Sequence, residues 1–160
     1  MTLPWPVLLA VALLAMLALA ALWRWRRRRL PRLEHITHLQ DAAASALADP
    51  GTLPCSLIRL QLRGPGARHP PLAEVARALR ARARRGGDHL ARSGSDGFAL
   101  WLGNTHAEAA QGLAEEIRAD LAPLLVRHDL RCSIGTATAT ASGGRLQALW
   151  EQATPPGSHP

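Results

Sequence analysis

The residues with the greatest potential for chemistry lie in segment 84–102, RRGGDHLARSGSDGFALWL. Its centre reads Gly94-Ser95-Asp96-Gly97-Phe98, in which Asp96 is the one acid. A carboxylate in a glycine-rich turn can ligate a divalent metal, but one carboxylate does not hold a catalytic pair of magnesium ions. Glycines also allow the positive φ angles of a tight turn. The segment is therefore a working catalytic turn, the remnant of one, or an ordinary glycine-rich hairpin.

Hydrophobic periodicity predicts the elements that must position this turn. Apolar residues at three- to four-residue spacing indicate helices at 33–48, 71–84, 106–127 and 144–153. Alternating or short apolar runs indicate strands at 56–62, 90–93, 98–102 and 131–139. The order α-β-α-β-β-α-β-α predicts an α/β or α+β sandwich with helices packed on a sheet. The tail, residues 154–160, is predicted to be disordered.

The N-terminal part of the chain carries a long apolar run without charge, residues 3–23. A helix of about 20 residues crosses the hydrocarbon core of a membrane. Trp5 and Trp23 stand at its ends, where aromatic side chains favour the interface. A cleaved signal peptide is the alternative, but it would carry positive charge before the apolar run. We therefore predict a transmembrane anchor and a basic juxtamembrane segment over residues 1–30.

Positive charge is concentrated directly after this run. The net charge is +7, and five of these charges come from Arg24, Arg26, Arg27, Arg28 and Arg29. The positive-inside rule predicts a single-pass protein with its N-terminus outside and its C-terminal domain cytoplasmic, which in a bacterium corresponds to the inner membrane. The arginines also favour contact with membrane lipid through anionic head groups. The remaining charge of about +2 gives no reason to expect a nucleic-acid partner.

The sequence contains two cysteines, Cys55 and Cys132. In a cytoplasmic domain we expect both thiols to be reduced and buried. No spacing of cysteine and histidine is typical of a zinc site. The sequence therefore predicts no metal site on these residues.

Several landmarks in the soluble part of the chain resemble the GGDEF domain of diguanylate cyclases. Residues 88–98, DHLARSGSDGF, match the family pattern D-x-x-x-R-x-G-G-D-E-F. Residues 34–39 stand where the family has its DxLTGL entry helix, and residues 133–135 match its SIG strand. Residues 150–153 stand in for its ADxA motif. The resemblance implies a nucleotidyl-cyclase-like fold, with a central, mostly antiparallel sheet flanked by helices.

The same resemblance indicates what the chain lacks for catalysis. A diguanylate cyclase joins two GTP molecules and needs divalent metal held by carboxylates. Arg59 stands where the family has a metal-binding acid on its first core strand, and Gly97 replaces the acid of the signature. The chain has no lysine to bind a triphosphate. We therefore predict that residues 31–153 form a degenerate, inactive GGDEF domain without metal or other cofactor, whose turn at 94–98 is structural.

A second family feature lies upstream of the turn. Many GGDEF domains bind their product at an RxxD site, and residues 85–88, RGGD, stand at that offset. Arginine can form bidentate hydrogen bonds with guanine O6 and N7 or with phosphate, and aspartate can accept from the guanine N–H edge. The resemblance therefore implies that Arg85 and Asp88 bind cyclic di-GMP. Arg82 or Arg92 is expected to assist them.

The predicted function is that of a membrane-anchored, inactive GGDEF domain acting as a cyclic di-GMP receptor. Bound ligand would bridge to a second protomer or to another membrane protein. A scaffold that binds no nucleotide and docks a membrane assembly is the alternative. Glu116 favours this alternative, because the family often has a third ligand-binding arginine at that position. Residual cyclase activity, alone or with an intact cyclase, is a third possibility that the missing ligands oppose.

Overall fold

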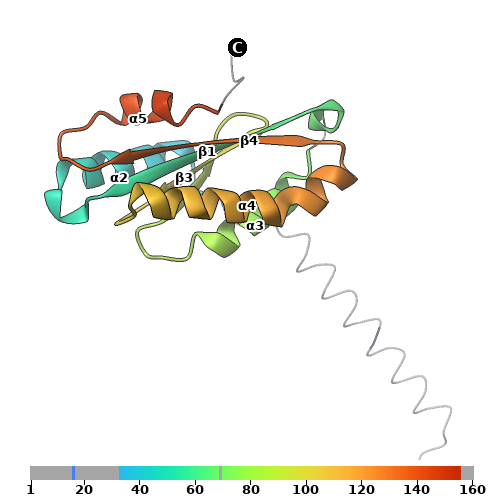
Figure 1. Cartoon of the computed structure of the whole chain (residues 1–160), viewed down its shortest axis with the longest axis horizontal. Coiled ribbons are helices and arrows are strands. Elements are labelled where there is room, and N and C mark those ends of the chain that lie inside the picture. The colour runs from blue at the N-terminus through green and yellow to red at the C-terminus, as the bar shows by residue number, and fades with distance from the viewer. Residues whose placement is uncertain (1–15, 17–32, 69, 156–160) are drawn as a thin grey trace, which may run out of the picture. The chain divides into compact units, whose positions relative to one another are not determined.

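The computed structural model describes residue 16, residues 33–68 and residues 70–155 (Figure 1). Within these ranges, no helix is both long and apolar enough to cross a membrane. The predicted membrane span at 3–23 and the arginines that follow it lie outside the described residues. Contacts divide the chain into two compact units, residues 1–30 and residues 31–160, and the second contains the elements that follow.

A four-stranded sheet forms the centre of the domain. Its strands are β1 (Cys55–Arg63), β2 (His89–Arg92), β3 (Gly97–Leu102) and β4 (Arg131–Ala139). They are ordered β2-β3-β1-β4, and each neighbouring pair is antiparallel. In the β1–β3 pair, Gln61 lies opposite Gly97, so the glycine-rich turn projects beside the later part of β1. The predicted antiparallel sheet is thus confirmed.

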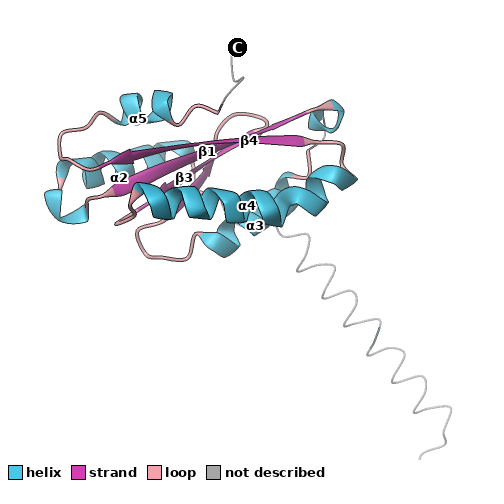
Figure 2. Cartoon of the chain, in the orientation of Figure 1, coloured by secondary structure: helices cyan, strands magenta, loops and turns pink. Residues whose placement is uncertain are grey.

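Helices cover both faces of this sheet (Figure 2). They are α2 (Ile36–Ala48), α3 (Leu72–Arg82), α4 (Ala107–Arg127) and α5 (Leu146–Gln152). Two short 3-10 helices, η1 (Pro50–Thr52) and η2 (Pro65–Arg68), flank β1 in the chain. Helices α3 and α4 pack together on one face, and α2 and α5 cover the other (Figure 1). The predicted sandwich of helices on a sheet is therefore correct.

The alternation of residues in β1 produces two hydrophobic cores. Ile58, Leu60 and Leu62 point into the core beneath α3 and α4. Cys55 and Leu57 point into the core beneath α2 and α5. Successive side chains of a strand face opposite sides of the sheet, so a strand covered on both faces is apolar on both. Each fully buried leucine contributes about 1.5–3 kcal/mol relative to an exposed one.

Strand β3 is buried along its whole length. Leu100 and Leu102 belong to the core beneath α3 and α4, whereas Trp101 belongs to the core beneath α2 and α5. The structure therefore buries both faces of this strand. The reason is that β3 lies inside the sheet, between β2 and β1.

The end of the described chain packs against the domain. The side chain of Pro155 is fully buried, and the Thr154 backbone N–H donates to the Glu151 carbonyl at 3.1 Å. Both residues fall within the tail predicted to be disordered, but they belong to the folded domain. The rest of that tail, residues 156–160, lies outside the described residues.

The chain enters the domain alongside β2. Glu34 forms a parallel β-bridge with Ala91, and its backbone N–H donates to the Leu90 carbonyl at 3.1 Å. The Glu34 carboxylate also pairs with His89 Nδ1 at 2.8 Å. The segment before α2 is thereby attached to the outer edge of β2 by backbone and side chain.

Candidate functional site

The glycine-rich turn is held by backbone hydrogen bonds. Ser93 N–H donates to the Gly97 carbonyl at 2.9 Å, and Leu62 N–H donates to the Asp96 carbonyl at 2.8 Å. Gly94 has φ of +81°, a conformation that glycine adopts without strain. Arg92 donates from Nη2 to the Ser95 carbonyl at 2.8 Å. The guanidinium of Arg92 thus stabilises the turn.

Gly97 cannot be replaced by an acid without a backbone shift. A Cβ atom at Gly97 would overlap the Ser93 carbonyl oxygen and approach the Leu60 carbonyl oxygen to 3.2 Å. The glycine therefore permits the close approach of β2 and β1 to the start of β3. The fourth residue of the family signature is here a packing position.

The surroundings of Asp96 do not fit a magnesium site. Its Oδ2 lies 3.5 Å from Gln61 Nε2, and its Oδ1 lies 3.5 Å from Ser95 Oγ. Among the described residues, no group of three or more histidine, cysteine or acidic side chains is placed to hold a metal ion. Magnesium prefers several oxygen ligands, and a lone carboxylate beside an amide and a hydroxyl does not supply them.

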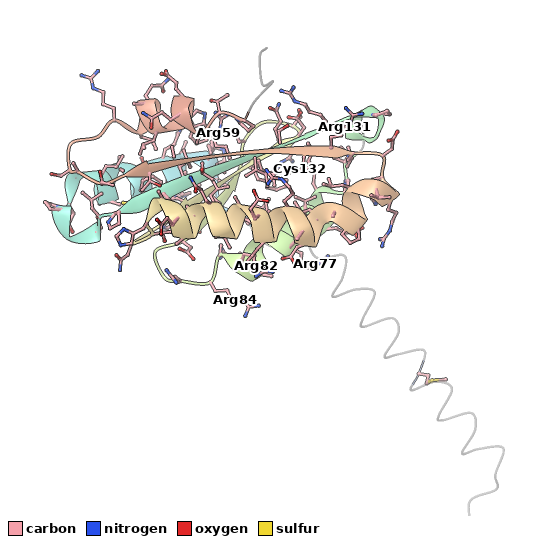
Figure 3. All side chains as sticks on the ribbon, viewed as in Figure 1. Arg59, Arg77, Arg82, Arg84, Arg131 and Cys132 are labelled. Atoms are coloured by element: carbon pink, nitrogen blue, oxygen red, sulfur yellow. The ribbon has the colours of Figure 1, made fainter. Side chains whose placement is uncertain are left out.

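Arg59, which is predicted to replace a metal-binding acid, lies on the face of the sheet that α5 covers (Figure 3). Its Nη1 donates to the Trp150 carbonyl at 3.0 Å and to Thr154 Oγ1 at 2.7 Å. Its Cζ lies 4.4 Å from the centroid of the Trp150 ring. Burial lowers the pKa of the Arg59 guanidinium below its usual value. The Arg59 guanidinium therefore binds the C-terminal segment through Trp150 and Thr154.

The space left beside Arg59 is small. A hollow of about 110 Å³ remains, lined by Arg59, Leu60, Gln61, Ser93, Gly97 and Pro155. Small-molecule sites typically have about 300–1,000 Å³. The C-terminal segment comes this close because position 135 is a glycine, where a Cβ atom would overlap the Ala153 carbonyl oxygen. This hollow is too small for a guanine nucleotide.

A larger hollow lies between α3, α4 and the loop that precedes β2. Its volume is about 350 Å³, and its lining is Arg82, Arg85, Asp88, Leu102, Thr105, Ala109, Gly112, Leu113 and Glu116. Three of the four residues predicted to bind ligand are therefore brought together: Arg82, Arg85 and Asp88. Arg92 is not in this lining and contacts the turn at the far end of β2.

Asp88 is the most informative residue of this hollow. It is 8% exposed, and its Oδ2 accepts from the Arg85 backbone N–H at 2.9 Å. Its Oδ1 is buried and has no hydrogen-bond partner within the described part of the chain. A buried carboxylate oxygen without a donor costs free energy, which a ligand that supplies an N–H donor would recover.

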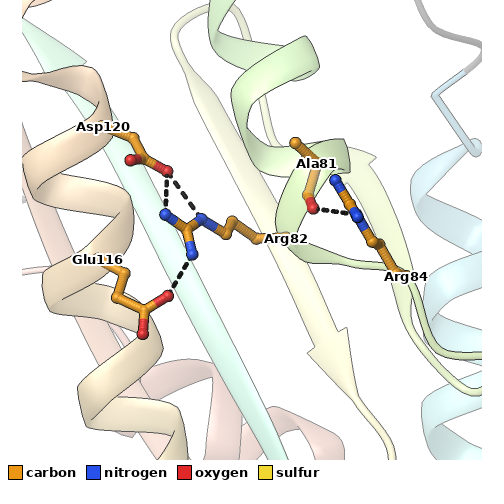
Figure 4. A network of polar contacts seen from close by, with 5 residues as sticks. All are labelled: Ala81, Arg82, Arg84, Glu116 and Asp120. Atoms are coloured by element: carbon orange, nitrogen blue, oxygen red, sulfur yellow. Dashed lines mark hydrogen bonds and ion pairs between the residues drawn. The ribbon is translucent and has the colours of Figure 1, made fainter.

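The two arginines of the hollow differ in their partners. In the described ranges, the Arg85 side chain has no hydrogen bond and no ion pair. Arg82 instead pairs with Glu116 and Asp120 of α4 (Figure 4). The sequence prediction missed Asp120, although two acids four residues apart on one helix face were a signal that could have found it.

A neighbouring hollow was also missed. It has a volume of about 500 Å³ and is lined by Gly51, Thr52, Arg85, Gly87, Gly103 and Asn104. Arg85 thus borders two hollows. No sequence pattern indicated the contribution of Gly51 and Thr52, because they reach this place only through the fold.

Comparison with known protein families assigns the chain to one of them. Residues 70–155 match the family described as "Diguanylate cyclase, GGDEF domain", and they make up more than half of the chain. The chain therefore belongs to the GGDEF family, as the sequence motifs predicted. A comparison with curated proteins yields no significant match.

Solved structures share the fold. A DGC protein from Thermotoga maritima superposes with a TM-score of 0.64 at 18% identity, over 78% of this chain and 98% of that one. The GGDEF domain of DgcB from Caulobacter crescentus, in complex with c-di-GMP, superposes with a TM-score of 0.61 at 20% identity, over 78% of this chain and 83% of that one. Diguanylate cyclase SiaD from Pseudomonas aeruginosa, in complex with its activator SiaC, superposes with a TM-score of 0.63 at 18% identity, over 92% of this chain and 63% of that one. At these identities the likeness establishes the fold.

Proposed function

We propose that this protein is a catalytically inactive GGDEF domain that binds cyclic di-GMP in the hollow between α3 and α4. Arg85 and Asp88 are the principal binding residues, and the ligand is regulatory rather than a cofactor. The N-terminal apolar run anchors the domain to the bacterial inner membrane, with the domain on the cytoplasmic side. Bound ligand joins the domain to a second copy or to another membrane protein.

The observation that carries the receptor proposal is Asp88 Oδ1, which is buried and accepts no hydrogen bond from any residue that the structure describes. Guanine offers N1–H and N2–H donors on one edge, and both would point at such a carboxylate. The free Arg85 guanidinium stands in the same lining and suits guanine O6 and N7 or a phosphate. The complex of the Caulobacter DgcB domain with c-di-GMP supports the choice of ligand.

The proposal of inactivity rests on the opposite face of the sheet. A guanidinium takes the place of a metal-binding acid at Arg59, and Asp96 has no second carboxylate beside it. Phosphoryl transfer depends on metal ions that neutralise developing charge. A cation at this place repels such ions instead of holding them.

Isothermal titration of the full chain, in detergent micelles, with cyclic di-GMP tests the receptor proposal. Arg85→Ala and Asp88→Asn are the informative variants, and Arg80→Ala is the matched control because Arg80 is an exposed arginine of α3 outside the hollow. We expect binding that weakens about tenfold or more in the first two variants and is unchanged in the control.

Two results would overturn these proposals. Absence of heat from the folded wild-type chain, or equal binding by Arg85→Ala, would remove the receptor proposal. Formation of cyclic di-GMP from GTP and magnesium by the purified chain would remove the proposal of inactivity.

One observation favours a second candidate, a scaffold that binds no nucleotide. Arg82 lies in the hollow, but Glu116 and Asp120 already occupy its guanidinium. A scaffold would tolerate Arg85→Ala without loss of function, whereas a receptor would not. The same titration therefore separates the two candidates.

A further inference from the structure

Three side chains form an ion-pair network between α3 and α4, here named the charge lock: Arg82, Glu116 and Asp120 (Figure 4). Asp120 Oδ2 accepts a hydrogen bond from Arg82 Nε at 2.7 Å and forms an ion pair with Arg82 Nη2 at 2.7 Å. Arg82 Nη1 donates to Glu116 Oε2. The two acids are four residues apart, so they lie on the same face of α4 and meet α3 together.

The charge lock uses the donors that a ligand would need. Each of the three guanidinium nitrogens of Arg82 lies against a carboxylate, so the acids balance its charge and only some of its five N–H donors remain for guanine or phosphate. Asp120 raises the pKa of Arg82, and Arg82 lowers the pKa of Asp120, in keeping with a close pair. The other arginine of the lining, Arg85, makes no side-chain hydrogen bond and no ion pair with any residue that the structure describes.

The charge lock also separates two spaces. The hollow of about 350 Å³ ends at Arg82, Leu113 and Glu116. A second hollow of about 490 Å³ begins at the same three residues and continues along Ala81, Arg84 and Asp120. When Arg82 leaves the acids, a cation becomes available at the border of the two hollows, where a ligand that extends beyond the first must pass.

We propose that the charge lock sets the affinity of the hollow for anionic ligand, with Glu116 and Asp120 as specificity-determining residues that withhold Arg82. The inference rests on the proposed function. A ligand with two phosphates must compete with two carboxylates for Arg82 and must also approach Glu116. The unlocked hollow would accept it more tightly than the locked one.

The charge lock is weak enough to be opened by a ligand. The side chains of Arg82, Glu116 and Asp120 are 34%, 56% and 39% exposed, so solvent screens their attraction. Exposed ion pairs of this kind each change an equilibrium by roughly fivefold or less. The lock therefore shifts a binding threshold and does not abolish binding.

A double-mutant cycle tests the proposal by titration of the full chain with cyclic di-GMP. The unlocked variant is Glu116→Gln with Asp120→Asn, which removes both charges and nearly keeps the shapes. Arg82→Ala is made in the wild-type and in the unlocked chain. Glu115→Gln is the matched control, because Glu115 is an exposed acid of α4 that pairs with Arg118 of its own helix.

The expected result is that the unlocked variant binds roughly tenfold more tightly than wild type. Arg82→Ala should remove this gain, yet change the wild-type affinity less than twofold. Asp120→Asn alone should tighten binding as well, although Asp120 does not line the first hollow. Glu115→Gln should leave the affinity unchanged. Thermal unfolding verifies that each variant is folded.

The proposal is overturned if the unlocked variant binds no more tightly than wild type, or if its gain persists without Arg82. If the wild-type chain does not bind cyclic di-GMP, the unlocked variant distinguishes failure of the receptor proposal from failure of the charge-lock proposal. Binding that then appears in the unlocked variant and depends on Arg82 would support the charge lock and reject the receptor function of the natural chain. No binding in either chain would reject both.

Discussion

The Arg59 guanidinium lies over the indole ring of Trp150, with 4.4 Å between Cζ and the ring centroid. The two residues are 91 positions apart, and the same arginine donates a hydrogen bond to the Trp150 carbonyl. Arg59 stands where the family is expected to have a metal-binding acid. In this structure it is a structural clamp that joins β1 to the end of α5.

Replacement of Arg59 by methionine should destabilise the domain. Arg59→Met keeps most of the side-chain length but removes the stack on Trp150 and the donors to Trp150 and Thr154. We expect the free energy of unfolding to fall by about 1–3 kcal/mol. Urea unfolding of the full chain, followed by far-ultraviolet circular dichroism, measures this change.

Arg80→Met is the control for this substitution, because Arg80 is exposed on α3. Its effect should stay within about 0.5 kcal/mol. Equal stability of Arg59→Met and wild type would contradict the assignment of Arg59 as a clamp.

Restoring the family's acid at position 97 should damage the fold and yield no activity. In Gly97→Glu, the new Cβ atom overlaps the Ser93 carbonyl oxygen, so the turn must shift. We expect a loss of about 1–3 kcal/mol in unfolding free energy.

Gly112→Ala in α4 is the matched control, because a Cβ atom there meets nothing within 4 Å. It should stabilise the helix by about 0.5–1 kcal/mol. A Gly97→Glu chain as stable as wild type would refute the packing role.

Both thiols should be unreactive in the folded protein. Burial raises the pKa of Cys132 to about 12 and also raises the pKa of Cys55, so neither is a thiolate at neutral pH. Iodoacetamide at pH 8 should modify neither residue in the folded chain and both in urea, as read by mass spectrometry. Rapid modification of the folded chain would show that these thiols are accessible.

The same pKa shift of Cys132 has a defined sign for stability. The unfolded thiol releases its proton near its ordinary value of 9.0, whereas the folded thiol holds it to about pH 12. Between these values the unfolded state binds fewer protons, so the unfolding free energy falls as pH rises. A Cys132→Val variant should show a smaller fall over this pH range.

Much of the fold followed from hydrophobic spacing. The strand predicted at 131–139 is β4 without a change of boundary, and the predicted helix at 106–127 is α4 with one residue fewer. These elements are long, and their apolar residues recur at the spacing that burial of one face requires, so the sequence alone predicts them. The family motifs then indicated the antiparallel sheet, which local spacing alone does not determine.

The site followed from the sequence only in part. The RGGD spacing brought Arg85 and Asp88 to the same hollow, because three residues span one short turn before β2. Arg82 was expected to assist the ligand, but its partners come from α4, 34 and 38 positions away. The choice between a ligand and two carboxylates is decided by how α3 packs on α4, which periodicity does not encode.

The attachment of Glu34 to β2 has a mechanical consequence. Strand β2 is short, with Asp88 next to its start and Arg92 at its end. The bridge from Glu34 to Ala91 and the pair with His89 couple the position of Glu34 to that of the strand. Because Asp88 lies directly before the same strand, a shift of Glu34 and occupancy of the hollow would both act on these four residues, His89–Arg92.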